Sequence, residues 1–367
     1  MSGHIEKDNV KYPPLRQIYF YLTGGCNLRC RHCWISPKYQ GESSSYPYLD
    51  YDLFCSIIAQ ARRLGLNGVK LTGGEPFLHP EIHRIIEHIR KEDLRLNIET
   101  NGVLCTKGLA EEIKACKNPF ISVSIDGADA ETHEYVRGVA GCFDGAIQGI
   151  GTLVEAGLRP QVIMTVMRRN KDQLEAVVRL AERLGAGSVK FNIVQPTERG
   201  VTLHETGAAL TIEELIEIGR WVEMALAKKT ALRLHYSHPV AFRPLSRLIK
   251  GNACNNGMCG IFGIIGVLSD GAYALCGIGE SVKELVFGRA EEVSLESVWR
   301  GSDVLRRIRA GLPEGLKGVC SACVMKKACL GNCVAQNYYR TKDLLSPYWF
   351  CEGAKKKGLF PESRLRG

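Results

Sequence analysis

The sequence predicts an α/β fold in which parallel strands and crossover helices form a partial barrel, followed by a smaller loop-rich domain. The barrel is predicted because short apolar runs of β-favouring residues alternate with helical patterns from residue 17 to about 195. Such alternation is typical of parallel strands joined by right-handed crossovers. The second domain is predicted because the chain becomes loop-rich and cysteine-rich after about residue 231, which indicates that something other than a large core stabilises it.

Six β-α units are expected in the barrel, which makes it a partial (β/α)6 barrel of the TIM type. The helical segments carry apolar residues at spacings of three and four, and several end at glycine. The expected strands are 18–23, 68–72, 94–100, 120–126, 160–166 and 188–194. The expected helices are 51–65, 80–91, 106–116, 143–157, 171–185 and a segment near 211–228.

The unusual motifs of the barrel all follow predicted strands. Cys26 follows the first strand, "GGEP" (73–76) the second, "TNG" (100–102) the third and "DG" (126–127) the fourth. Chemistry in such barrels gathers at the C-terminal ends of the strands. We therefore expect an N-terminal extension at 1–15, a barrel at 16–230 and a second domain at 231–367, with the functional site at the barrel mouth.

The composition excludes several protein classes. Hydrophobic residues at 45% and charged residues at 24% are ordinary for a soluble globular chain of 367 residues. No signal peptide and no membrane-spanning run of about 18 apolar residues is present. Fifteen cysteines, an odd number, argue against a disulfide framework, so a reduced cytoplasm with metal-bound thiols is expected.

The net charge of +9 comes partly from the tail "KKKGLFPESRLRG". This tail is either a solvated basic surface or a site that attracts an acidic peptide or another anion. Basic and aromatic residues do not interleave as in a nucleic-acid-binding module, so no nucleic-acid partner is expected.

The stretch "TGGCNLRCRHCWIS" (23–36) places Cys26, Cys30 and Cys33 in a CX3CX2C pattern. Three thiolates can ligate three irons of a 4Fe-4S cluster and leave the fourth iron open to a small molecule. The alternative is a zinc knuckle with a distant fourth ligand such as His32. A structural zinc site is a closed four-ligand shell, however, and would not explain the glycine-rich loop after the second strand.

CX3CX2C after the first strand of a β-α barrel, with "GGEP" after the second, closely resembles the radical S-adenosylmethionine (SAM) enzymes. The resemblance covers roughly residues 16–230. It implies that the amino and carboxylate groups of SAM chelate the open iron. It also implies that Gly73, Gly74 and Glu75 form the motif that lines the methionine end of SAM, where glycine permits close backbone approach.

The same resemblance suggests three further SAM contacts. Ser124 in "SVSIDG" and Arg137 in "EYVRG" are similar to the family's polar and cationic partners of the ribose and the carboxylate. The alternatives are a capping hydroxyl for Ser124 and a surface ion pair for Arg137. His32 occupies the position where the family usually has an aromatic residue beside the adenine, and the alternative is a solvent-facing side chain.

The cysteines after residue 250 resemble the SPASM extension of radical SAM enzymes. Cys276 closes a GX4C element, and a CX2CX5CX3C run and a last cysteine follow. The resemblance implies two auxiliary 4Fe-4S clusters, both without an open iron. One would use Cys254, Cys259, Cys276 and Cys333, and the other Cys320, Cys323, Cys329 and Cys351. Two zinc-ribbon sites are the alternative.

The expected cofactors are thus three 4Fe-4S clusters and SAM. Four cysteines remain without a mutual pattern and are interpreted as ordinary buried residues: Cys55, Cys105, Cys116 and Cys142. We assign no catalytic side chain beyond the SAM cluster. In sulfatase maturases, which share the SPASM extension, an aspartate follows the cysteine of the GX4C element, whereas Gly277 follows Cys276 here, which argues against formylglycine formation.

The resemblance implies that a 5′-deoxyadenosyl radical abstracts hydrogen from a ribosomally synthesised peptide, giving a thioether or carbon-carbon crosslink or a related modification. The alternatives are tetrapyrrole or haem side-chain chemistry, a sulfatase maturase, and a non-catalytic iron-sulfur electron-transfer protein. The expected partners are a peptide, an electron donor such as flavodoxin or ferredoxin, and no membrane. Only about fifteen residues precede the first strand, so a leader peptide would dock on the barrel mouth, the second domain or a separate protein.

Overall fold

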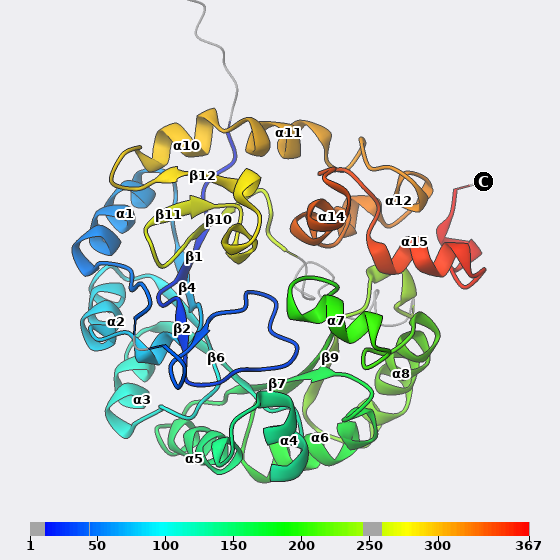
Figure 1. The fold of residues 1–367 in the computed structure, drawn as a ribbon, viewed down its shortest axis with the longest axis horizontal. Coiled ribbons are helices and arrows are strands. Elements are labelled where there is room, and N and C mark those ends of the chain that lie inside the picture. The colour runs from blue at the N-terminus through cyan, green and yellow to red at the C-terminus, as the bar shows by residue number, and fades with distance from the viewer. Residues whose placement is uncertain (1–11, 44, 245–258, 367) are drawn as a thin grey trace, which may run out of the picture.

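The structure, a computed structural model, describes residues 12–43, 45–244 and 259–366 and is built around one ten-stranded sheet. The strand order is β12-β11-β10-β1-β4-β5-β6-β7-β8-β9 (Figure 1). The strands of this sheet are β1 Gln17–Tyr21, β4 Gly68–Thr72, β5 Arg95–Thr100, β6 Lys117–Ser124, β7 Gln161–Val166, β8 Ser188–Ile193, β9 Arg233–Tyr236, β10 Ile264–Val267, β11 Ala272–Ala274 and β12 Val286–Arg289. A small parallel pair is formed by β2 Gly25–Cys26 and β3 Lys38–Tyr39.

The predicted α/β class and the parallel barrel core are confirmed. Every pairing from β10 through β1 to β9 is parallel, while β11 and β12 are antiparallel additions at one end. The helices of the barrel surround the strands in Figure 1. They are α1 Tyr51–Arg63, α2 Ile82–Lys91, α3 Lys107–Lys114, α4 Ala130–Arg137, α5 Cys142–Glu155, α6 Leu174–Arg183 and α8 Ile212–Met224. A further helix, α7 Arg199–Glu205, lies inside this ring in Figure 1.

Alternation along the strands separates an apolar layer from a polar lumen. In β4, Val69 and Leu71 are fully buried in the main core, and the partly buried Lys70 lies between them. The same holds in β8, where Val189 and Phe191 join the core on either side of Lys190. Because successive strand residues face opposite sides, the intervening polar side chains line the inside of the barrel.

The C-terminal region continues the barrel sheet. Gln17 of β1 pairs with Ile264 of β10, and β9 pairs with β8, so the sheet extends beyond residue 230, where we expected the first domain to end. Figure 1 shows that helices of this region continue the outer ring. The helices are α10 Leu295–Gly301, α11 Asp303–Gly311, α12 Val319–Ala322, α13 Lys326–Cys329, α14 Val334–Thr341 and α15 Trp349–Lys356.

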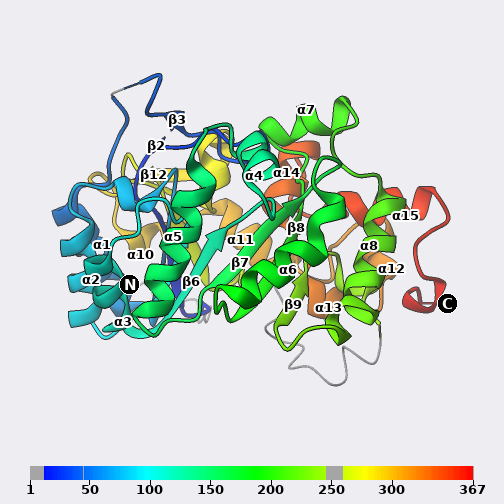
Figure 2. The ribbon, with the colours of Figure 1, turned by 90° about the horizontal axis from the view of Figure 1, so that it is seen from below.

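Short 3-10 helices connect these elements at Pro76–Leu78, Lys171–Gln173, Leu226–Lys228, Val240–Phe242, Gly277–Glu280, Lys283–Leu285 and Glu362–Arg364. Figure 2 shows β2, β3, α4 and α7 at one end of the barrel, which is the end where the parallel strands finish. Within the described ranges, no helix is long and apolar enough to cross a membrane.

Candidate active site at the barrel mouth

The three thiols of the CX3CX2C motif lie together at the C-terminal end of β1. Cys26 and Cys30 are buried in a small apolar cluster against which Cys33 packs. Burial, together with the neighbouring thiol of Cys30, raises the pKa of Cys26 well above its ordinary value. A thiolate at this position therefore requires positive charge beside it, and a metal cluster supplies such charge.

The glycine-rich loop after β4 is held against the cysteine loop by backbone hydrogen bonds. Gly74 N donates to Thr23 O at 3.0 Å, and Glu75 N donates to Gly25 O at 3.0 Å. A methyl group on Gly74 would lie 1.7 Å from the carbonyl oxygen of Gly25, and Gly73 has a positive φ of 130°. Only glycine fits both positions, because the two loops approach so closely.

The carboxylate of Glu75 joins this loop to the loop after β5. It accepts hydrogen bonds from Thr100 Oγ1 at 2.7 Å, Asn101 N at 2.8 Å and Phe77 N at 3.2 Å. Burial raises the pKa of Glu75 to about 7, although the hydrogen bonds from Asn101 and Thr100 act in the opposite direction. Glu75, which was predicted to line the SAM site, therefore also holds the two loops together through buried hydrogen bonds.

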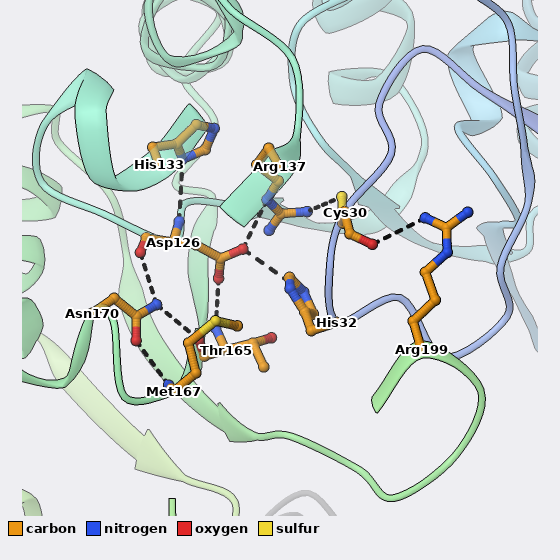
Figure 3. Close-up of polar contacts among 9 residues, drawn as sticks. All are labelled: Cys30, His32, Asp126, His133, Arg137, Thr165, Met167, Asn170 and Arg199. Carbon is orange, nitrogen blue, oxygen red and sulfur yellow. Dashed lines mark hydrogen bonds and ion pairs between the residues drawn. The ribbon is translucent and has the colours of Figure 1, made fainter. Parts of the chain in front are cut away.

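A buried ion pair lies beside the cysteine loop (Figure 3). Asp126 Oδ2 is 2.8 Å from Arg137 Nε, and both side chains are buried. Arg137 Nη1 also donates to Cys30 Sγ at 3.5 Å. Burial alone would lower the pKa of Arg137, but Asp126 and Cys30 together outweigh burial and raise that pKa, so the guanidinium is held charged next to a thiol. Arg137 is thus part of a buried pair and not of a surface ion pair.

Asp126 was not predicted as a site residue, although its position after the fourth strand was noted. Its second oxygen accepts from Thr165 N at 2.7 Å, and Asn170 Nδ2 donates to its backbone carbonyl at 2.9 Å. Burial raises the pKa of Asp126, but Arg137, His32 and the hydrogen bond from Thr165 together lower it by more, so the net shift is downward. An aspartate directly after a strand, in reach of an arginine on the next helix, was the available signal.

His32 lies inside this network and does not face solvent. Its Nε2 is 3.7 Å from Asp126 Oδ2, and burial, against the opposing influence of Asp126, lowers its pKa to about 4. Arg199 of α7 approaches from the other side and donates to the carbonyl of Cys30 at 3.0 Å (Figure 3). Ser124 lies in β6, on its lumen-facing side, and the helix that follows is capped by Asp129. Ser124 is therefore not a cap.

A second set of thiols lies among the short C-terminal helices. A small apolar cavity of about 20 Å³ is lined by all four cysteines that were grouped as one ligand set: Cys320, Cys323, Cys329 and Cys351. Burial raises the pKa of Cys329 to about 12 and that of Cys351 well above its ordinary value, with Cys320 contributing in each case. These thiols share one pocket although Cys351 belongs to α15.

Three members of the other predicted set also lie together. Burial raises the pKa of Cys276 to about 12, with Cys333 as the next cause, and Cys333 and Cys276 act on Cys259 in the same way. The fourth predicted member, Cys254, lies outside the described residues. Among the residues that the structure describes, no three His, Cys, Asp or Glu side chains are grouped closely enough to hold a single metal ion.

Gly277 is in contact with the ring of Tyr21 of β1. A methyl group at Gly277 would lie 2.3 Å from Tyr21 Cε1, and Tyr21 is almost fully buried. A tyrosine therefore fills the space beside Cys276. The position after the GX4C cysteine can carry a side chain only if this ring moves.

Of the four cysteines without a pattern, Cys105 and Cys116 are buried in the main core, Cys55 is half-buried against it, and Cys142 is buried elsewhere. Cys142 differs from the others because it packs with Cys26 and Cys30 in the apolar cluster of the cysteine loop. It lies at the start of α5 and is 3% exposed.

Comparison with known proteins identifies the family. The model of the Radical SAM superfamily matches residues 20–181. The chain is 32% identical over 352 residues to the AdoMet-dependent heme synthase of Methanosarcina barkeri, an alignment that covers 92% of this chain and 96% of that protein. The chain belongs to the radical SAM superfamily.

Two further similarities extend beyond the radical SAM domain. The mycofactocin maturase MftC of Mycobacterium tuberculosis is 26% identical over 353 residues, covering 94% of this chain and 85% of that protein. The structure of Streptococcus suis SuiB bound to precursor peptide SuiA superposes with a TM-score of 0.73 at 18% identity and covers 94% of this chain and 77% of that one. The fold that this radical SAM enzyme shares with SuiB thus includes its C-terminal region.

The residues at the barrel mouth fit a radical SAM cluster and SAM. Three thiols are collected in a buried apolar cluster, and the Arg137 guanidinium that touches Cys30 compensates thiolate charge. Beside them, the loop of Gly73 and Gly74 presents backbone without Cβ atoms. A 4Fe-4S cluster and SAM are therefore the cofactors of this radical SAM enzyme.

Proposed function

We propose that this radical SAM enzyme modifies a ribosomally synthesised peptide by hydrogen abstraction, giving an oxidative thioether or carbon-carbon crosslink or a related product. The observation that carries this proposal is that a mycofactocin maturase and a protein solved with a precursor peptide match more than nine-tenths of the chain and not only the barrel. MftC aligns with 94% of the chain, and the fold of SuiB with its precursor peptide covers the same share.

In this mechanism Cys26, Cys30 and Cys33 would hold the cluster, and the Gly73–Glu75 loop, Ser124, His32 and Arg137 would line the SAM site. A bound and reduced cluster would supply one-electron chemistry for the reductive cleavage of the sulfonium bond of SAM. The chain contributes enclosure and charge. Asp126 keeps Arg137 charged and oriented, and the buried thiol cluster keeps water away from the reacting groups.

Two auxiliary 4Fe-4S clusters, both fully ligated by cysteine, complete the proposed enzyme. Cys320, Cys323, Cys329 and Cys351 share one cavity, and Cys259, Cys276 and Cys333 lie together, with Cys254 as the proposed fourth ligand. Closed clusters suit electron transfer better than substrate binding. Flavodoxin or ferredoxin is the proposed electron donor, and the cytoplasm is the proposed location because these thiols must stay reduced.

Tetrapyrrole side-chain chemistry is a second candidate, and a specific observation favours it. The relative with the higher identity, at 32% over 96% of its own length, is a heme synthase. Formylglycine formation lacks comparable support, since the ring of Tyr21 occupies the space beside Gly277. A non-catalytic electron-transfer protein would have no use for the close-packed glycine loop and the Arg137 pair.

Anaerobic co-expression with the short peptide encoded beside the gene, in deuterated water, tests the proposal. High-resolution masses of the peptide are compared between the wild type and a variant in which Cys26, Cys30 and Cys33 are replaced by alanine. A loss of two hydrogens that requires these cysteines is expected for crosslinking, and deuterium gain at one carbon would indicate epimerisation.

The control is 5′-deoxyadenosine release from the purified enzyme on addition of dithionite and SAM. An unmodified peptide from enzyme that still releases 5′-deoxyadenosine would refute the peptide proposal and favour the tetrapyrrole. No release in the presence of intact clusters would favour the electron-transfer protein.

A further inference from the structure

Three charged side chains from three strands lie on the lumen side of the barrel sheet, and two of them form an ion pair. Lys70 Nζ of β4 is 2.6 Å from Glu99 Oε1 of β5, and Lys190 of β8 acts on Glu99 from across the lumen. The Glu99 side chain is 41% exposed, although its charge is close enough to Tyr19 and Tyr21 of β1 to help raise the pKa of each tyrosine. Its exposed surface therefore opens into the lumen and not to the outside of the protein.

Lys190 differs from Lys70 because it lacks a partner. Within the described residues, Lys190 forms no hydrogen bond and no ion pair. Its ammonium is also not one of the fully buried side-chain groups that lack a hydrogen-bond partner, so it is not sealed off from water. Burial lowers its pKa, Glu99 raises it and Lys70 lowers it again, with a net downward shift. A lysine amine inside a barrel, reached by water and left without an acceptor, is available to a ligand.

The position of Lys190 places it beside the cofactor site. Ser124, a proposed SAM contact, pairs with Ile163, and Ile163 pairs with Lys190. Lys190 is therefore level with Ser124 and two strands away, which at strand spacings of about 4.8 Å is roughly 10 Å along the sheet. A group held by Lys190 would lie next to SAM without competing for it.

The other charged groups of this part of the lumen leave an excess of positive charge. His235 pairs with Lys190 in register, and burial, with Arg233 and Lys190 as further causes, lowers its pKa, so it is neutral near pH 7. Glu99 balances Lys70, to which it is directly bonded. Of the two lysines described on these strands, Lys190 is the one that forms no ion pair, and its complement is an anionic group of the substrate.

From these observations, and resting on the proposed function, we propose that Lys190 is a specificity residue that binds a substrate carboxylate inside the barrel. For a peptide substrate, this carboxylate is an aspartate or glutamate side chain near the modified carbon. A tetrapyrrole would present a propionate to the same ammonium. The Lys70–Glu99 pair fixes the lumen geometry and keeps Glu99 from neutralising Lys190.

Equilibrium binding without reductant tests the subsite independently of turnover. Two pairs of probes are titrated into the reconstituted enzyme. The first pair is the labelled peptide encoded beside the gene and the same peptide with every Asp and Glu changed to Asn and Gln. The second pair is a porphyrin with four propionates and the corresponding tetraamide. The variants are Lys190→Gln, Lys190→Glu and the conservative Lys190→Arg. Lys107→Gln, on the exposed start of α3, is the matched control.

The wild type is expected to bind one acidic probe about 10- to 100-fold tighter than its amide, as for a charge-assisted hydrogen bond. Lys190→Gln removes this preference, Lys190→Glu reverses it, and Lys190→Arg and Lys107→Gln retain it. Thermal melting confirms that the variants fold. A preference for the acidic peptide supports both proposals, whereas a preference for the acidic porphyrin alone supports the subsite and refutes the peptide function.

Three results would overturn the subsite itself. They are equal affinity of the wild type for acid and amide forms of both probes, no binding of either acidic probe, and an unchanged preference in folded Lys190→Gln. The first two results would show that the site does not recognise a carboxylate. The third would show that Lys190 is not the residue that recognises it.

Discussion

At the scale of single residues, Gly74 sets how closely the glycine-rich loop approaches the cysteine loop. A Gly74→Ala substitution would place a methyl group 1.7 Å from the Gly25 carbonyl oxygen, so the loops must separate. Such overpacking costs about 1–3 kcal/mol of unfolding free energy. We expect a lower melting temperature and weaker SAM binding, measured by thermal denaturation and equilibrium dialysis.

Gly151→Ala is the matched control for this substitution. Gly151 lies within α5, and a methyl group there would meet nothing within 4 Å. Because alanine favours a helix interior, this variant should be as stable as the wild type or up to about 1 kcal/mol more stable. Equal melting and SAM binding in the two variants would show that the contact at Gly74 does not constrain the loops.

His133 provides a prediction on pH. Burial, with Arg137 as the next cause, lowers its pKa to about 4, and its Nδ1 accepts from Asp126 N at 3.2 Å. Since the unfolded residue has a pKa near 6.5, the unfolded chain binds more protons between these values, and stability falls as the pH drops. Between pH 7 and 5, wild type should lose on the order of 2 kcal/mol more than His133→Gln in urea unfolding. If the unfolding free energies of the two proteins changed equally with pH, the prediction for His133 would be wrong.

Residue types in short-range patterns were predictable here, and long-range pairings were not. The thiols and glycines of the site follow from their spacing in the sequence, because the chemistry restricts those positions to one residue type. Asp126 and His32 belong to one network, but an aspartate after a strand and a histidine beside a cysteine each have many uses. Only the fold shows that Arg137 joins them.

At the scale of elements, α15 brings Cys351 to the cavity formed by α12 and α13. We expect Cys351→Ala to lose about four iron atoms per chain, since an incomplete four-thiolate shell holds its cluster poorly. Iron and sulfide analysis after anaerobic reconstitution measures this loss. Cys116→Ala, in the main core, should keep the wild-type iron content. Equal iron in both variants would remove Cys351 from the ligand set.

The six predicted strands are present because each is a run of β-favouring residues next to a clear helical pattern. The continuation of the sheet was missed, since β10 to β12 are short and contain residues such as Gly266 and Gly288 that weaken a strand signal. The place of β10 is decided by its pairing with β1, which lies at the other end of the chain, and β11 and β12 follow from β10. No local pattern reports such a pairing.

At the scale of the whole molecule, residues 361–366 tie distant segments together. Arg364 donates to the carbonyls of Ala241 and Arg243 at 3.2 and 3.1 Å, and Leu365 bridges to Cys323. Removing residues 361–367 should reduce the iron held by the C-terminal helices and leave SAM binding intact, because the barrel mouth makes no bond to this segment within the described residues. Iron analysis and equilibrium dialysis measure the two effects.

Point variants distinguish the effect of the Arg364 hydrogen bonds from the effect of shortening the chain. Arg364→Ala removes the two side-chain hydrogen bonds and should lower the unfolding free energy by about 1–3 kcal/mol. Glu362→Ala, at an exposed neighbour, should change it by less than about 0.5 kcal/mol. If truncation weakens SAM binding as strongly as iron content, the segment supports the whole molecule and not one region.

The pairing of β1 between β4 and β10 has a consequence for biosynthesis. On one side β1 can bond to β4 as soon as residues 68–72 leave the ribosome, but its other edge stays open until residues 264–267 have been made. During that interval the nascent barrel presents an unpaired apolar strand that invites association with other chains. A fragment ending near residue 230 would keep this exposed edge permanently, so the radical-generating half should not be obtainable as a stable separate protein.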